Sequence, residues 1–234
     1  MILIVGDIHS AWRQFNALLN ERRPDAVLQC GDFGFWPGHR FHDPAEKLLP
    51  HATHIHWVDG NHDDHGAIQE RIQSNQFHLS ESLPNVIYQP RGSTLTLPDG
   101  RTALFAGGAF SVDNRVRLPG RDWFPDLEVL TEEDLKNFPD PTSVKIDIVI
   151  SHTAPDEFSA DGLPLDLWPE WWDRDLDPST KVLSKVLHAY KPSLWFFGHF
   201  HLYQEGSYGG CKWYGLDHAQ GSTRWWMELP GACR

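Results

Sequence analysis

Five short apolar runs of this chain each end in side chains that can bind a metal ion. The ends read Gly6-Asp7-Ile8-His9, Gly31-Asp32, Gly60-Asn61-His62-Asp63, Ser151-His152 and Gly198-His199-Phe200-His201. Short apolar runs bounded by glycine are typical of buried strands, and glycine lets a neighbouring backbone approach closely. In open α/β sheets, sites form beyond the carboxyl ends of the strands. We therefore expect the five segments to converge on one edge and to form one site.

The first third of the chain alternates between strand and helix patterns. Apolar residues spaced for one helix face occupy residues 11–22. The expected elements are strands at 2–5, 25–30 and 53–58 and helices at 11–22, 43–49 and 63–73. This alternation indicates a layered α/β fold in which helices connect parallel strands.

The rest of the chain predicts hairpins and long loops. From residue 77 to 112, Pro and Gly interrupt short alternating runs, which indicates antiparallel strands and a hairpin. We also expect a short helix at 131–137, a strand at 146–150, a helix at 179–190, a strand at 194–197 and closing strands in the tail. No linker divides the chain, so we expect one domain over residues 1–234, with the long loops 113–142 and 155–178 near the site.

Composition narrows the class of protein. A chain of 234 residues with 40% hydrophobic content can bury a sizeable core. The formal net charge of −12 disfavours a nucleic-acid partner without excluding one. No apolar run approaches a membrane span, and the N-terminus lacks a basic leader, so no membrane partner is expected. The cysteines Cys30, Cys211 and Cys233 are widely spaced, which favours a cytoplasmic location. Composition leaves the oligomeric state open.

The candidate ligands share one kind of chemistry. They are carboxylates, imidazoles and one amide, without a thiolate, and this set suits Mn, Fe, Zn or Co better than a structural zinc site. The candidates are Asp7, His9, Asp32, Asn61, His152, His199 and His201. They exceed what one tetrahedral ion needs and suffice for two divalent ions that share a carboxylate. Such ions, about 3.5–4 Å apart, clamp a phosphate and activate a water.

In their order along the chain, from Asp7 to His201, the segments resemble the calcineurin-like metallophosphoesterases, whose pattern is D-x-H, G-D, G-N-H-[ED], H and G-H-x-H. The resemblance implies an α/β fold: a four-layer αββα sandwich of two mixed β-sheets flanked by helices. It also implies a dinuclear centre, with Mn preferred and Fe, Zn, Co or Ni as alternatives.

The resemblance also implies roles for individual residues. One ion is held by Asp7, His9, Asp32 and His201, and the other by Asp32, Asn61, His152 and His199, with Asp32 as the bridge. His62 faces the phosphate and protonates or stabilises the leaving oxygen. Asp63 either orients His62 or stands as a carboxylate at a helix N-terminus.

The sequence departs from one branch of the family. Ser/Thr protein phosphatases carry G-D-x-x-D-R-G and a Glu after G-N-H, whereas Gly31–Gly38 lacks that arginine and Asp63 follows His62. We therefore favour a phosphodiesterase for nucleotides or related small molecules that uses a hydroxide bound to the dinuclear centre. The alternatives are a phosphomonoesterase, including a protein phosphatase, a nuclease, and a non-catalytic metal-binding scaffold.

Two arginines and several aromatic residues are candidates for substrate binding. Arg115 or Arg117, after Gly107-Gly108, either meets a phosphate or forms a surface ion pair. The sequence GGAFSVD of this loop resembles a loop of small bacterial and phage members of the family. The loop aromatics either stack a nucleobase or anchor the loops; they are Trp123, Phe124, Trp168, Trp171 and Trp172. His39 and Arg40 either line the site or are exposed.

Overall fold

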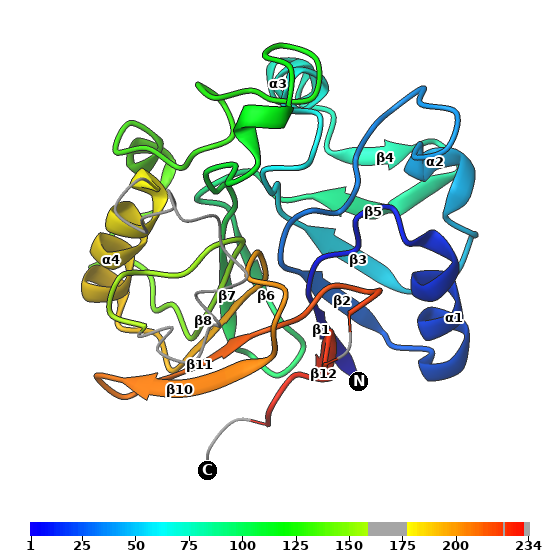
Figure 1. The fold of residues 1–234 in the computed structure, drawn as a ribbon. Helices are drawn as coiled ribbons and strands as arrows, with labels where there is room; N and C mark the ends of the chain where they lie inside the picture. Colours follow the sequence, from blue (N-terminus) through cyan, green and yellow to red (C-terminus); the bar gives the residue numbers. More distant parts are fainter. Residues whose placement is uncertain (159–176, 222, 232–234) are drawn as a thin grey trace.

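The computed structural model describes residues 1–158, 177–221 and 223–231 and arranges them around two mixed six-stranded sheets (Figure 1). The first sheet contains, in spatial order, β12 (Trp226–Glu228), β1 (Ile2–Val5), β2 (Ala26–Gln29), β3 (His54–Trp57), β5 (Leu83–Tyr88) and β4 (His78–Ser80). The second contains β10 (Gln204–Tyr208), β11 (Cys211–Gly215), β9 (Leu194–Phe197), β8 (Ile148–Ser151), β7 (Thr102–Ala106) and β6 (Thr94–Thr96). As expected, β1, β2 and β3 are parallel neighbours, and so are β8 and β9.

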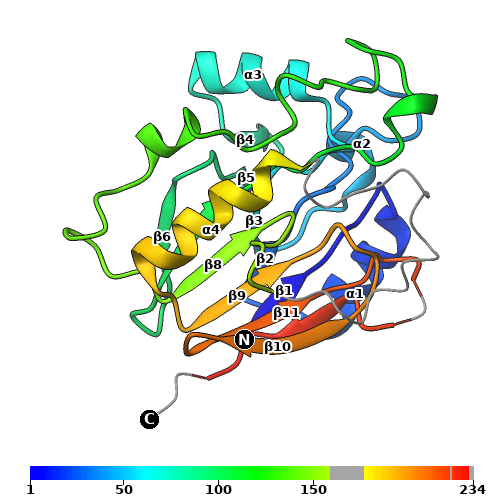
Figure 2. The same ribbon diagram turned by 60° about the vertical axis from the view of Figure 1, so that its left-hand side comes forward.

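Helices flank the pair of sheets, and α1 and α4 lie on its opposite sides (Figures 1 and 2). The helices are α1 (Trp12–Arg22), α2 (Pro44–Lys47), α3 (His65–Ser74) and α4 (Pro178–Tyr190), with the 3-10 helices η1 (Asn114–Val116) and η2 (Asp134–Asn137). Within the described residues, none of the helices has the length and apolar character needed to cross a bilayer.

Three apolar layers hold these elements together. Leu3 and Val5 of β1 pack with α1 and α3, whereas Ile4, between them in sequence, faces the second sheet because side chains alternate along a strand. Phe196 of β9 shares this central layer, and Trp195 lies in a third layer with α4. The layers α, β, β and α confirm the predicted sandwich.

Two local expectations differ from the structure. The segment 77–112 forms the expected antiparallel strands, β4 with β5 and β6 with β7, but the two pairs lie in different sheets. Outside each pair, β5 pairs with β3 and β7 pairs with β8, both in parallel. The helix expected at 131–137 is the 3-10 helix η2. There the Asp134 carboxylate accepts hydrogen bonds from the Thr131 amide at 2.7 Å and hydroxyl at 2.9 Å, which closes a turn. Pro139 and Pro141 prevent a longer helix.

Candidate metal centre

The five motif segments meet where the two sheets come together. They follow β1, β2 and β3 of the first sheet and β8 and β9 of the second. Hydrogen bonds join the segments to one another. The His199 amide donates to both carboxylate oxygens of Asp7, across the two sheets, at 3.1 Å, and the Gly198 amide donates to the His152 carbonyl, within the second sheet, at 3.0 Å. The loops are therefore fastened to one another as well as to their own strands.

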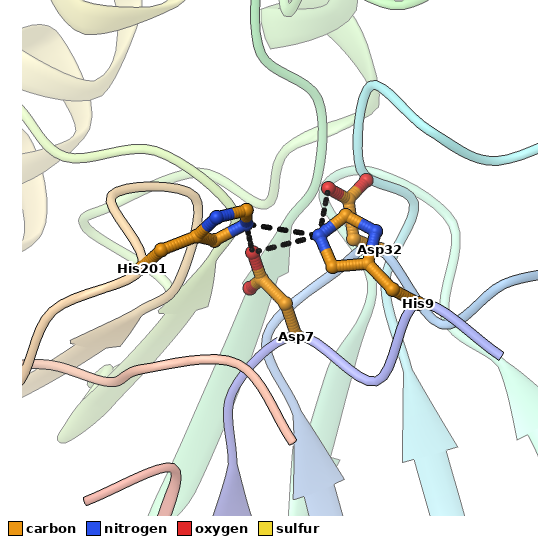
Figure 3. A group of neighbouring side chains, drawn as sticks. All are labelled: Asp7, His9, Asp32 and His201. Atoms are coloured by element: carbon orange, nitrogen blue, oxygen red, sulfur yellow. Dashed lines mark hydrogen bonds and ion pairs between the residues drawn. The ribbon is translucent and has the colours of Figure 1, made fainter. Parts of the chain in front are cut away.

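One group of four side chains is drawn in Figure 3. The ligand atoms of Asp7, His9, Asp32 and His201 all lie within 4.8 Å of one another. His201 Nε2 is 3.1 Å from Asp7 Oδ2 and 2.9 Å from His9 Nε2. Both carboxylates are buried, whereas the His201 side chain is 44% exposed, so solvent reaches this group from the imidazole side.

A second group adjoins the first through Asp32. His152 Nε2 lies 3.0 Å from Asn61 Oδ1 and 3.4 Å from Asp32 Oδ2. The centroids of the His152 and His199 rings are 5.0 Å apart. His152, Asp32 and Asn61 are all at most 1% exposed, so this group lies deeper than the first.

Backbone strain concentrates at these side chains. Four candidate ligands have φ angles in the left-handed region: His9 at 47°, Asp32 at 51°, His199 at 66° and His201 at 52°. Non-glycine residues rarely adopt this conformation. Of the four others in the described chain, three are helix C-caps and the fourth, Ser10, follows His9. Strain of this kind persists where the surrounding structure imposes it, which is typical of functional sites.

Two motif glycines provide space for the carboxylates. A Cβ atom at Gly60 would overlap the carboxylate of Asp32, and one at Gly198 would overlap the carboxylate of Asp7. In both places, the residue before a candidate ligand from one strand lies directly against a candidate ligand from another. A side chain larger than hydrogen would push the segments apart.

The charges of the centre are strongly linked. Burial alone would lower the pKa of His152, but the carboxylates of Asp32 and Asp7 outweigh burial and raise it to about 10. Burial likewise raises the pKa of Asp32, but the neighbouring imidazoles, above all His152, bring it well below its usual value. His152 Nδ1 donates to the Cys30 carbonyl at 2.8 Å, which leaves Nε2 directed at Asp32 and Asn61.

His62 lies beside the first group, with its ring centroid 5.2 Å from that of His9, whereas the Asp63 carboxylate is directed at the backbone. Asp63 accepts hydrogen bonds from four backbone amides: Phe33 at 3.3 Å, Gly34 at 2.8 Å, Phe35 at 2.7 Å and Gly60 at 2.9 Å. Burial and the nearby Asp32 raise the pKa of Asp63 to about 7, against the effect of these amides. Asp63 therefore joins the loop after β2 to the loop after β3. The N-cap of α3 is the next residue, Asp64.

A carboxylate from another loop lies next to His62. Asp113 Oδ2 is 3.6 Å from His62 Nε2, and Asp113 Oδ1 is 3.6 Å from Arg117 Nη1. Arg117 donates to the Asn61 carbonyl at 3.1 Å and also to the Asp122 carbonyl. Arg117 is therefore at the site, bound to its backbone, whereas Arg115 is exposed.

The first long loop is attached to the site by buried polar contacts. Glu128 accepts hydrogen bonds from the Ser111 amide and hydroxyl at 2.8 Å and from the Trp123 indole at 3.1 Å. Ser111 Oγ in turn lies 3.4 Å from Asn61 Nδ2. Trp123 therefore anchors the loop. The ring centroids of Phe124 and His65 are 6.0 Å apart. The other aromatic residues proposed for these loops, Trp168, Trp171 and Trp172, are outside the described residues.

The sequence analysis did not identify a second set of buried polar contacts, centred on Asp59, that holds the loops of the site in place. Asp59 accepts from Arg91 at 2.6 Å and from the Tyr88 hydroxyl at 2.8 Å, and Arg91 also donates to the Val129 carbonyl at 2.7 Å. Gly107 packs directly against Asp59. Asp59 immediately precedes Gly60 in a motif, and this adjacency was the signal that could have identified it.

His218 is a further imidazole that the motif pattern did not include. Its ring centroid lies 4.6 Å from that of His201 and 6.2 Å from that of His9. It follows β11, so an Asp-His pair after a closing strand was its only sequence signal. His42, which is exposed like His39 and Arg40, is among the residues that line the hollow beside His62, whereas His39 and Arg40 are not.

The side chains of both groups suit divalent ions. Each offers oxygen and imidazole nitrogen atoms without a thiolate, and His152 is held in the tautomer that keeps Nε2 available. Asp7, His9, Asp32 and His201 would hold one ion, and Asp32, Asn61, His152 and His199 form the adjoining group.

Solved structures of other proteins share the fold. The structure is similar to that of TT1561 from Thermus thermophilus, with a TM-score of 0.56, 15% identity, and coverage of 93% of this chain and 89% of that chain. It is also similar to GAP50, the anchor in the inner membrane complex of Plasmodium, with a TM-score of 0.50, 13% identity, and coverage of 99% of this chain and 75% of that chain. At these identities the likeness shows a common fold. No curated protein matches the chain.

The family comparison covers most of the sequence. The model of the calcineurin-like phosphoesterases matches residues 1–203, a range that includes all five motif segments. The protein therefore belongs to the calcineurin-like phosphoesterases, a family of metal-dependent hydrolases of phosphate esters.

Proposed function

We propose that the protein hydrolyses phosphate esters at a centre of two divalent ions and favours phosphodiesters of nucleotides or related small molecules. The observation that most supports this is the position of Asp32. Its Oδ2 lies 3.4 Å from His9 Nε2 and 3.4 Å from His152 Nε2. One carboxylate thus reaches both groups of candidate ligands, as a bridge between two ions requires.

The residues have distinct roles in this proposal. Asp32 bridges the two ligand groups, and Mn is the preferred metal, with Fe, Zn, Co and Ni as alternatives. When bound, two such ions supply an activated water and neutralise charge on the phosphate oxygens. His62 donates a proton or a hydrogen bond to the leaving oxygen. Asp113 attracts the His62 imidazole and limits its orientations.

The small number of positively charged side chains beside His62 supports a phosphodiester substrate. Among the described residues that line the adjoining hollow, Arg117 is the only arginine or lysine. Its guanidinium is directed at the Asn61 carbonyl, the Ser111 hydroxyl and the Asp122 carbonyl. A phosphodiester carries one negative charge, whereas a monoester carries up to two at neutral pH. The diester therefore needs fewer cations from the protein.

The location and organisation that we propose rest on simpler observations. Cys30 and Cys211 are buried free thiols, which supports a reducing, cytoplasmic location. The core layer between the two sheets supports a single domain over residues 1–234. The substrate that we propose is a small molecule whose leaving group fits the hollow of about 260 Å³ beside His62.

Metal analysis combined with two substrates tests the proposal. We expect the purified protein to bind about two Mn ions per chain and to hydrolyse bis-p-nitrophenyl phosphate faster than p-nitrophenyl phosphate. Asp32→Asn should lower the metal content and abolish hydrolysis, whereas Asp126→Asn, at an exposed position of the first long loop, should change neither. Faster hydrolysis of the monoester would identify a phosphomonoesterase, and absence of metal-dependent hydrolysis of both esters would contradict the proposal.

A further inference from the structure

The hollow beside His62 has a distinctive lining. It is formed by the loops that follow β1, β2, β3 and β7 and includes the candidate ligand His9. Its lining includes Trp36, His42, His62, Asp113, Arg117 and Asp122. The proposed function places the leaving oxygen at His62, and on that basis the leaving group occupies this hollow.

The lining presents negative charge to a ligand. Asp113 and Asp122 are both among the lining residues, and the Asp113 carboxylate lies 3.6 Å from His62 Nε2. The positive charge of Arg117 is directed mainly at protein oxygens, and its side chain is only 7% exposed. The other arginines of these loops, Arg40, Arg115 and Arg121, are exposed and do not belong to the lining that the structure describes.

The apolar part of the lining is held in place. The Trp36 indole donates a hydrogen bond to the His62 carbonyl at 2.8 Å, which keeps the ring beside the proposed leaving-group residue. His42 adds a second ring at the hollow. Flat rings and carboxylates together suit a carbon skeleton that carries hydrogen-bond donors.

We propose that the hollow selects leaving alcohols that bear hydroxyl or ammonium groups and discriminates against leaving groups with a carboxylate or further phosphates. Asp122 is the specificity-determining residue. Its Oδ1 accepts a hydrogen bond from the Leu118 amide, so the carboxylate is held on the loop that lines the hollow. Asparagine can retain this acceptor while removing the charge, which makes Asp122→Asn a suitable variant.

The test uses three aryl phosphates whose phenols have similar acidity. The phosphates of tyramine, tyrosol and 4-hydroxyphenylacetate end in an ammonium, a hydroxyl and a carboxylate, and each is measured as the monoester and as the methyl diester. We expect kcat/KM of the Mn-loaded parent protein to decrease in that order. Asp122→Asn should reduce the ratio of the ammonium substrate to the carboxylate substrate about fivefold. Asp126→Asn removes the same charge from an exposed position outside the described lining and should leave the ratio unchanged.

The outcomes separate the two proposals. If neither these esters nor the p-nitrophenyl esters are hydrolysed, the proposed function fails. If p-nitrophenyl esters are hydrolysed but the ratio is the same in the parent and Asp122→Asn, the charge selection is wrong. The charge selection is also wrong if the parent protein prefers the carboxylate substrate. It is wrong as well if the parent hydrolyses p-nitrophenyl esters but none of the three aryl phosphates.

Discussion

The carboxylate of Asp113 lies between the imidazole of His62 and the guanidinium of Arg117, 3.6 Å from each. Asp113 belongs to the loop after β7 of the second sheet, whereas His62 follows β3 of the first. The contact thus joins loops from both sheets beside the candidate metal centre. It gives His62 a charged neighbour that is not the next residue in its motif.

Asp113→Asn tests this relationship. We expect kcat for phosphoester hydrolysis to fall about tenfold or more, because the imidazole loses the charge that limits its orientation. Metal content should be unchanged, since Asp113 is not among the candidate ligands. Asp126→Asn serves as the matched control. An unchanged kcat, or an equal loss in both variants, would show that Asp113 does not position His62.

Asp63→Asn should weaken the fold and the site together. The carboxylate accepts four hydrogen bonds from backbone N–H groups. In asparagine, the side-chain NH2 group would face some of these N–H groups, so two donors would meet without an acceptor. We expect the free energy of unfolding in urea to fall by about 1–3 kcal/mol, with weaker Mn binding in calorimetry. Asp64→Asn is the control, because asparagine is an equally good N-cap for α3. Equal stability of the two variants would contradict the role given to Asp63.

Arg91→Met removes one partner of a buried ion pair. Arg91 lies 2.6 Å from the Asp59 carboxylate, which is 1% exposed. The variant leaves that charge uncompensated, and we expect a loss of about 3–5 kcal/mol in the free energy of unfolding. Lys185→Met removes a pair of similar length, 2.6 Å, from Glu132, but both side chains are exposed. That control should lose at most about 1 kcal/mol; a loss as large as that of Arg91→Met would refute the argument.

His56 makes the stability of the metal-free protein depend on pH. Burial lowers the pKa of His56 in the folded state from 6.5 to about 4. Between these values the unfolded chain binds a proton that the folded chain does not, so the free energy of unfolding decreases as the pH falls. The contribution of this residue to the slope is at most about 1.4 kcal/mol per pH unit and vanishes above pH 6.5.

Urea unfolding of the metal-free protein from pH 7.5 to 4 measures this slope. His56→Gln should have a smaller slope than the parent protein, because one buried imidazole no longer titrates. His54→Gln, at the exposed neighbouring position of β3, should retain the slope of the parent. Parallel curves for the parent and His56→Gln would show that His56 does not contribute.

Much of the fold followed from local patterns. The helix face of residues 11–22 and the runs that end at Asp7, Asp32 and His199 predicted elements that the structure contains. These patterns are readable because a strand or helix imposes its period on the residues within it. The hairpins were harder: whether β5 pairs with β4 alone or also with β3 depends on distant strands, which no local pattern records.

The sequence by itself determined which side chains stand at the ends of the strands, because each follows its own apolar run within a few residues. Only the tertiary structure decided their neighbours. It placed Asp113 rather than Asp63 beside His62 and added His218 next to His201. These contacts join loops from different strands, and their geometry depends on how the two sheets pack against each other. That packing arises from the whole core and is not encoded in any one motif.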